Sequence, residues 1–285
     1  MSVVVVTDST AYLPETPGAA GVTVVPLHIV MGGESGREGI EIGPASVAKA
    51  LGAPADRGRR ITVSTSQPTP AEFAAVYSRL FDEGASAIVS VHLAAGLSGT
   101  YAGALSAAAE ARGPVEVVDS GSTGMGLGFP ALAAAAAAAA GGDLAGVRDA
   151  AMRAIENTST FFYVDTLEHL RRGGRITAVS ALLGTALAVK PLLEVVKGQI
   201  TLRDKVRTAG RALDRLAAIA MEAAGDGPVE LAVHHLAAPA RATMLTDTLC
   251  QKLGERVKAC YTSEVGAVVA AHVGPGLAGV VVHRL

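Results

Sequence analysis

The sequence is poor in aromatic residues and lacks tryptophan altogether. Aromatic residues make up 4% of the 285-residue chain, whereas hydrophobic residues as a whole make up 50%. The apolar content is therefore largely aliphatic, with many alanines and valines. Small aliphatic side chains let helices pack closely on sheets, and a binding cavity in such a protein would be lined by methyl groups rather than by stacking rings.

An excess of positive charge is also missing, and so is a recognisable set of metal ligands. The net charge is −2, and no run of Lys and Arg with interleaved aromatic residues occurs. Nucleic-acid binding therefore has no electrostatic support. Cys250 and Cys260 have no Cys or His beside them at metal-ligand spacing, so we expect no metal site and interpret both as apolar residues.

Long hydrophobic runs are absent as well. The N-terminal apolar run ends at Thr7 and Asp8 and has no basic flank, so it predicts a first buried strand rather than a signal peptide. The alanine run at residues 133–140 is too short and too weakly apolar to span a membrane. We expect a cytoplasmic protein with no stable membrane insertion.

What the sequence does contain is an alternation of short β-branched runs with helical stretches. Buried strands are expected at residues 3–6, 61–63, 87–91 and 115–118, and helices at residues 44–51, 70–83, 100–112 and 127–140. This order predicts a mainly parallel sheet with helices on both faces. Residues 22–42, with Gly32-Gly33 in the middle, predict a hairpin beside that sheet.

The second half of the chain has a different pattern. Lys197-Gly198 predicts a tight turn between strands at residues 191–196 and 199–205, which gives this half a mixed sheet. Its helices are expected at residues 144–157, 167–171, 178–187, 209–224, 239–253 and 264–271. We therefore predict an α/β protein with two domains, residues 1–155 and residues 156–285.

Hydroxyl groups follow the carboxyl ends of four predicted strands. The loops concerned are residues 7–10, 64–68, 97–100 and 119–122. Ligands of open α/β sheets bind at this edge, and helix N-termini there favour a small anion. Any single Ser, Thr or Asp in such a loop is more often an N-cap. The loops contain no Lys, Arg or His, which suits a carboxylate better than phosphate chemistry.

Seven segments spread over nearly the whole chain carry a resemblance to a known family. They read VVTDSTAYLP at residues 5–14, TVSTSQPTPAEF at 62–73, LSGTYAGA at 97–104, VVDSGSTGMGLGF at 117–129, LRRGGRI at 170–176, VKPLLEVVKGQI at 189–200 and HVGPGLAGV at 272–280. In this order they resemble the DegV family. The resemblance implies a two-domain fold that holds one long-chain fatty acid, such as palmitate or oleate, between the domains, with no other cofactor.

The resemblance also implies which residues bind the ligand and what the protein does with it. The implied carboxylate-binding residues are Thr65, Ser98, Gly99, His272 and Arg175. Residues expected to support them are Ser66, Asp8 and Ser120. Some relatives present the bound fatty acid to a separate fatty acid kinase, which converts the carboxylate to an acyl-phosphate, and the carrier itself performs no catalytic step.

Two other functions remain open on the sequence alone. A transferase or hydrolase for acyl or phosphoryl groups would act on a small anionic substrate, with His272 as base beside Ser98. A regulatory adaptor would instead recognise a partner through a basic face formed by Arg203, Lys205 and Arg207, although a solvated strand face is the simpler explanation of those residues.

Overall fold

The computed structural model describes residues 2–52, 61–176 and 189–285. Its internal contacts divide the chain into two compact units. Unit 1 comprises Met1–His28 and Ser66–Asn157, and unit 2 comprises Ile29–Thr65 and Thr158–Leu285. Residues 29–65 thus group with the second half of the chain. The domain boundary predicted at residue 155 stays a prediction.

Unit 1 is built on a four-stranded parallel sheet, as the alternation of strands and helices predicts. Its strand order is β2-β1-β6-β7, and all three pairings are parallel. The strands are β1 (Val3–Asp8), β2 (Val22–Val25), β6 (Ala87–His92) and β7 (Val115–Asp119). Val6 lies opposite Ser90, and His92 lies opposite Asp119. The polar residues that end these strands therefore meet at one edge of the sheet.

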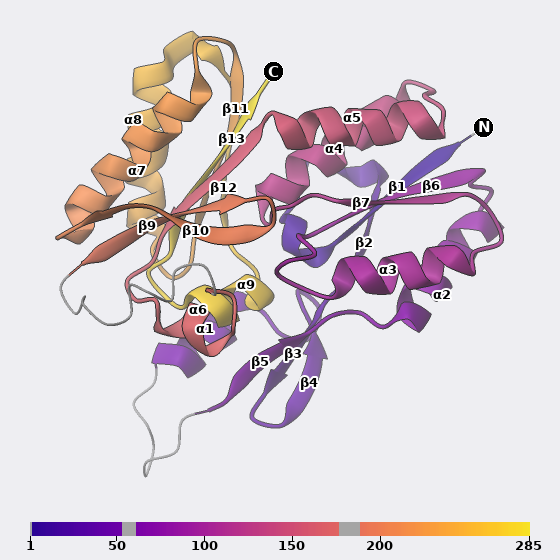
Figure 1. The fold of residues 1–285 in the computed structure, drawn as a ribbon, viewed down its shortest axis with the longest axis horizontal. Coiled ribbons are helices and arrows are strands. Elements are labelled where there is room, and N and C mark those ends of the chain that lie inside the picture. The colour runs from indigo at the N-terminus through magenta and orange to yellow at the C-terminus, as the bar shows by residue number, and fades with distance from the viewer. Residues whose placement is uncertain (1, 53–60, 177–188) are drawn as a thin grey trace. The chain divides into compact units, whose positions relative to one another are not determined.

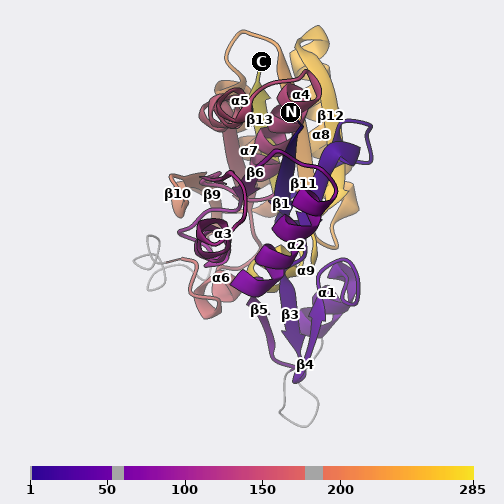
Figure 2. The same cartoon turned by 90° about the vertical axis from the view of Figure 1, so that its right-hand side faces the viewer.

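Helices cover both faces of this sheet (Figures 1 and 2). The helices α2 (Pro70–Asp82) and α3 (Thr100–Ala109) lie on one face, and α4 (Met125–Ala139) and α5 (Leu144–Glu156) lie on the other. The start of α2 follows the sequence signal closely. Thr69 and Glu72 form a capping box, and Pro70 opens the first turn. Asp143 caps α5 by accepting the amide of Gly146.

The strand expected at residues 61–63 was wrong in both position and partner. Strand β5 (Val63–Ser66) belongs to a separate three-stranded sheet, β4-β3-β5, with β3 (His28–Met31) and β4 (Glu34–Arg37). The side chain of Ile61 is 52% exposed, so this run is not a core strand. The parallel sheet takes β2 as its fourth strand instead. The predicted hairpin exists only as β3 and β4, joined at Gly32-Gly33, where both φ angles are positive.

Unit 2 contains a six-stranded mixed sheet with strand order β10-β9-β8-β13-β11-β12. Its strands are β8 (Thr158–Tyr163), β9 (Lys190–Val196), β10 (Gln199–Val206), β11 (Val229–His235), β12 (Val257–Glu264) and β13 (Ala278–Arg284). The β11–β12 pair is parallel and the other pairs are antiparallel. Lys197 and Gly198 both have positive φ, which confirms the predicted tight hairpin turn.

Two groups of helices complete unit 2. The long helices α7 (Ala209–Ala224) and α8 (Pro239–Leu253) pack on the mixed sheet and form its apolar core. Three shorter helices, α1 (Pro44–Gly52), α6 (Glu168–Arg172) and α9 (Ala267–Val273), pack together separately, with α9 in contact with both others. The helix predicted at residues 178–187 lies outside the described residues. None of the helices in the described ranges is long and apolar enough to cross a membrane.

Candidate functional site

One cavity in unit 2 collects three of the predicted site residues. It has a volume of about 410 Å³, and Thr65, Arg175 and His272 all line it. Further lining side chains include Arg172 and His169. The three predicted residues come from segments far apart in the sequence, so the tertiary structure of unit 2 brings them to one place.

The elements around the cavity explain how His272 reaches it. Helix α9 carries His272 in its last turn and packs against α1 and α6. The start of α9 is held by Glu38, whose buried carboxylate accepts the amide of Val268 at 2.8 Å. Arg175 follows the end of α6. The packing of α6 on α9 therefore brings the segment that contains Arg175 close to the segment that contains His272.

Thr65 and His272 are joined by a hydrogen bond. Thr65 Oγ1 lies 2.8 Å from His272 Nε2, although 207 positions separate the two residues in the sequence. Burial, together with the smaller effect of the positive charge of Arg175, lowers the pKa of His272 to about 4. At neutral pH the imidazole is therefore uncharged, with one nitrogen as donor and the other as acceptor.

Arg175 supplies the cavity with a guanidinium group. Its Nη1 donates to the carbonyl oxygen of Gly173, which ties the side chain to the turn after α6. Arg172, on the last turn of α6, forms an ion pair with Glu168. A guanidinium beside a hydroxyl and a neutral imidazole is a combination that suits an anion.

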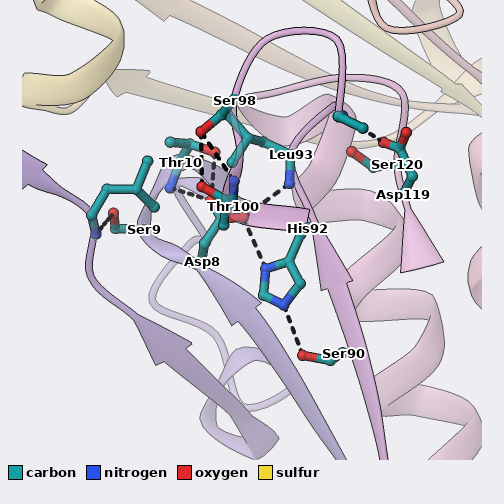
Figure 3. Close-up of polar contacts among 12 residues, drawn as sticks. Asp8, Ser9, Thr10, Ser90, His92, Leu93, Ser98, Thr100, Asp119 and Ser120 are labelled. Atoms are coloured by element: carbon teal, nitrogen blue, oxygen red, sulfur yellow. Dashed lines mark hydrogen bonds and ion pairs between the residues drawn. The ribbon is translucent and has the colours of Figure 1, made fainter. Parts of the chain in front are cut away.

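The remaining predicted ligand-binding residues, Ser98 and Gly99, belong to unit 1. Ser98 Oγ lies 2.9 Å from Thr100 Oγ1 and accepts the Thr100 amide at 3.3 Å (Figure 3). Gly99 is the N-cap residue of α3, and because glycine has no side chain, no side-chain oxygen occupies the amides at the start of this helix from that position. A Cβ atom at Gly99 would lie 2.7 Å from the side-chain nitrogen of Gln67, so this glycine allows Gln67 to cover the loop. The first amides of α3 are the groups that a helix leaves available to an anion.

Asp8 organises the loops at this edge of the unit 1 sheet. Its fully buried carboxylate accepts hydrogen bonds from the amide and the hydroxyl of Thr10, at 3.1 and 2.6 Å, from the amide of Leu93 at 2.9 Å and from Nδ1 of His92 at 3.1 Å (Figure 3). The carboxylate therefore joins the end of β1 to the end of β6.

The loop that Asp8 holds leads directly to Ser98. Ala94, the residue after Leu93, donates its amide to the carbonyl of Ser122 at 2.8 Å, and its own carbonyl accepts the amide of Ser98 at 3.2 Å. Ser120 strengthens the neighbouring turn, because its hydroxyl accepts the amide of Ser122 at 3.2 Å. Asp8 and Ser120 thus lie where they can shape the Ser98 loop, whereas Ser66 is exposed and bonds the carbonyl of Gln67.

A Ser–His–Asp arrangement in unit 1 escaped the reading of the sequence. Ser90 Oγ lies 2.7 Å from His92 Nε2, and His92 Nδ1 contacts Asp8 (Figure 3). Tyr77 donates its hydroxyl to Ser90 at 2.9 Å. Ser90, His92 and Asp8 are fully buried, so the chain of hydrogen bonds belongs to the core and is closed to a substrate. The sequence does offer one indication of this arrangement, because Ser90 and His92 are two residues apart on β6 and therefore lie on the same face of the strand.

The sequence comparisons identify close relatives over the full length. The chain matches the profile described as "Uncharacterised protein, DegV family" over residues 2–284. A DegV domain-containing protein of Streptomyces coelicolor is 52% identical over 281 residues, with 98% of each chain covered. A second one, from Mycobacterium tuberculosis, is 42% identical over 287 residues, with 99% of this chain and 97% of the relative covered.

The chain belongs to the DegV family. Two solved DegV structures agree with the fold. The Thermus thermophilus protein, described as a fatty-acid-binding DegV family protein, superposes with a TM-score of 0.92 at 32% identity, and both chains are covered completely. The fatty-acid-binding DegV of Bacillus subtilis gives a TM-score of 0.88 at 31% identity, again over both whole chains. The predicted two-domain α/β class, with one mainly parallel and one mixed sheet, is confirmed.

For this DegV protein, several statements about the site stay predictions. The structure of unit 2 joins Thr65 to His272 and places Arg175 in the same cavity. That Ser98 and Gly99 share one ligand with these three residues is still a prediction, because they belong to the other unit. The same holds for the alternative enzyme, which requires His272 to act as a base on Ser98.

Proposed function

We propose that this DegV protein binds one long-chain fatty acid. Thr65, Ser98 and the amide of Gly99 bind the carboxylate, and His272 and Arg175 stand beside it. The observation that carries the proposal is the hydrogen bond between Thr65 and His272 in a cavity that Arg175 also lines. The solved relatives from Thermus thermophilus and Bacillus subtilis, described as fatty-acid-binding, support the same ligand class.

The energetics of such a ligand match the kinds of groups that the chain provides. Roughly 15 methylene groups gain on the order of 12 kcal/mol on leaving water, and the loss of freedom on binding offsets a large part of this gain. A carboxylate that enters the same dry site needs hydrogen bonds to offset its lost hydration. A hydroxyl, a backbone amide and a guanidinium supply charge-assisted hydrogen bonds for that purpose.

The proposal is tested first on the protein as purified from cells. Mass spectrometry after denaturation should detect bound acyl chains, and delipidated protein should take up oleate or palmitate. Thr65→Ala and Ser98→Ala should each weaken binding about tenfold, because each removes a hydrogen bond to a charged group. The matched controls are Thr201→Ala on β10 and Ser78→Ala on α2, which should bind as the unmodified protein does.

Two results would contradict the binding proposal. One is a protein that carries no acyl chain and takes up neither oleate nor palmitate. The other is unchanged affinity in both Thr65→Ala and Ser98→Ala, which would remove those residues from the site even if a fatty acid binds elsewhere.

The proposal extends to what happens to the bound fatty acid. The protein presents the carboxylate to a separate fatty acid kinase, which phosphorylates it to an acyl-phosphate, and the carrier contributes no catalytic step. Arg203, Lys205 and Arg207 are candidates for the docking face, since Arg203 and Lys205 are exposed on β10 and Arg207 is exposed directly after it. Acyl-phosphate formation from ATP should require both proteins and should fall with Lys205→Glu; formation that is independent of the carrier would refute this role.

A further inference from the structure

The imidazole of His272 lies directly against Gly173 and leaves no room there for a side chain. A Cβ atom placed on Gly173 would lie 2.3 Å from Nδ1 and 3.1 Å from Cε1 of His272. The backbone of Gly173 has a φ angle of −73°, a helical value that any L-residue adopts. Glycine is therefore required at this position by the imidazole and not by the backbone conformation.

A second contact between a ring and a glycine mirrors the first. A Cβ atom on Gly274 would lie 2.3 Å from Cδ2 and 2.6 Å from Nε2 of His169. His169 belongs to α6 and Gly274 follows α9, whereas His272 belongs to α9 and Gly173 follows α6. Each helix therefore places an imidazole on the glycine that ends the other helix, and the two helix ends interlock.

The surroundings of its two ring nitrogens indicate where His272 carries its proton. Nε2 lies 2.8 Å from Thr65 Oγ1, whereas Nδ1 is buried and has no hydrogen-bond partner within the described part of the chain. A proton on Nδ1 would be a buried donor without an acceptor, which folded proteins avoid more strictly than an unused acceptor. The neutral ring therefore carries its proton on Nε2.

This position of the proton sets the direction of the hydrogen bond. The Nε2–H group of His272 donates to Thr65 Oγ1, so the hydroxyl hydrogen of Thr65 remains available to another acceptor. A nitrogen that donates has no free lone pair with which to remove a proton from that hydroxyl. The contact therefore suits the binding of a carboxylate and does not suit activation of Thr65 as a nucleophile.

We propose that Gly173 is a positioning residue for His272. It allows the imidazole to stand in its Nε2–H form against Thr65, so that Thr65 donates its hydroxyl hydrogen to the carboxylate of the ligand. His169, through its contact with Gly274, holds the end of α9 that carries the same imidazole. The identity of the acceptor rests on the proposed fatty-acid function, but the proton position of His272 is measurable in the delipidated protein.

The test compares Gly173→Ala with Gly210→Ala, a change at an exposed position of α7 where a Cβ atom meets nothing within 4 Å. In the delipidated protein, ¹⁵N NMR should show His272 protonated at Nε2, and this signature should be lost in Gly173→Ala only. Oleate affinity should fall about tenfold in Gly173→Ala and stay unchanged in Gly210→Ala. In a His272→Ala background, adding Gly173→Ala should cause no further loss, because the two changes act through one ring.

Measurements of thermal stability distinguish a positioning role of Gly173 from a general destabilisation of the protein. If Gly173→Ala lowers the melting temperature through the clash with His272, the double variant Gly173→Ala/His272→Ala should recover most of that loss. An unchanged tautomer in Gly173→Ala, or an affinity loss of the same size with and without His272, would overturn the proposal. If no variant binds oleate, the unmodified protein included, the fatty-acid function fails while the NMR result still judges the role of Gly173.

Discussion

A single buried carboxylate, that of Asp8, shows how one residue can order two loops. Charge in a protein interior is tolerated where donors surround it, and loss of one partner leaves the others unsatisfied. Asp8 meets this condition with donors from Thr10, His92 and Leu93. Because Leu93 precedes the residue that holds the Ser98 amide, the same carboxylate supports the proposed binding loop.

We therefore predict that Asp8→Asn lowers the stability of the protein and disturbs the loop that carries Ser98. The amide NH₂ of asparagine would face a backbone or imidazole N–H, which places donor against donor. The free energy of unfolding should fall by about 2–3 kcal/mol, measured by urea denaturation. Asp143→Asn is the matched control, since asparagine caps a helix as well as aspartate does. Equal stability of the two variants would show that the Asp8 network contributes little.

At the level of single residues, the sequence indicates the polar residues of the predicted site but not all of their hydrogen-bond partners. Thr65 and His272 were predicted to serve one ligand, and the structure joins them by a hydrogen bond. The sequence predicts only a supporting role for Asp8, and no motif in it indicates a role for His92. The link from Asp8 to His92 depends on the register of β1 against β6, which no local pattern in the sequence specifies.

Among the elements, α4 illustrates close packing by small residues. Gly128 lies in this helix, and a Cβ atom there would lie 2.5 Å from Met125 Sδ and 2.7 Å from the carbonyl oxygen of Ala11. The carbonyl is part of the backbone and cannot rotate away as a side chain can. Gly128 therefore sets how closely α4 approaches the short helical turn η1 (Ser9–Ala11) that follows β1.

Gly128→Ala should consequently destabilise the protein although alanine is the better helix former. Overpacking costs about 1–3 kcal/mol and outweighs the gain in helix propensity of at most about 1 kcal/mol. Gly210→Ala in α7 keeps the propensity gain without the clash and should raise the melting temperature slightly. Thermal unfolding of both variants measures the difference, and a Gly128→Ala protein as stable as Gly210→Ala would refute tight packing of α4.

Strand assignment shows where element-level prediction failed. Residues 22–25 and residues 61–63 are both short β-branched runs, and local composition does not say which of them joins a given sheet. In the structure, Val22–Val25 pairs with β1, whereas β5 begins at Val63 in the small sheet and remains partly exposed. The helix starts were easier to predict, because caps such as Thr69 and Asp143 act within one turn.

For the molecule as a whole, buried neutral histidines link stability to pH. Burial lowers the pKa of His234 to about 4, and burial together with Arg175 lowers that of His272 to about 4. The ordinary value of 6.5 applies in the unfolded chain, so between pH 6.5 and 4 the unfolded state binds more protons. Stability is therefore fully present above pH 6.5 and is lost as the pH falls through this range.

We predict that these two histidines leave the free energy of unfolding unchanged between pH 7 and 8. Between pH 6.5 and 4 their titration should lower it. By pH 5 each histidine should account for a loss of about 2 kcal/mol. His234→Asn, which keeps an amide near Ser263, should show a shallower decline when denaturation is measured at pH 7 and pH 5. A decline as steep as in the unmodified protein would mean that His234 does not carry this pH dependence.

The sequence by itself determined the α/β class, the parallel and mixed sheets, most helices and the polar loops, because periodicity, caps and turn residues act over a few positions. Tertiary structure alone decided that residues 29–65 group with the second half, that β2 completes the parallel sheet, and that Thr65 meets His272. It also decided that Gly173 packs against the imidazole ring of His272 and that Gly274 packs against that of His169. These contacts join segments separated by up to 207 positions, and their geometry is fixed by packing that no short stretch of sequence encodes.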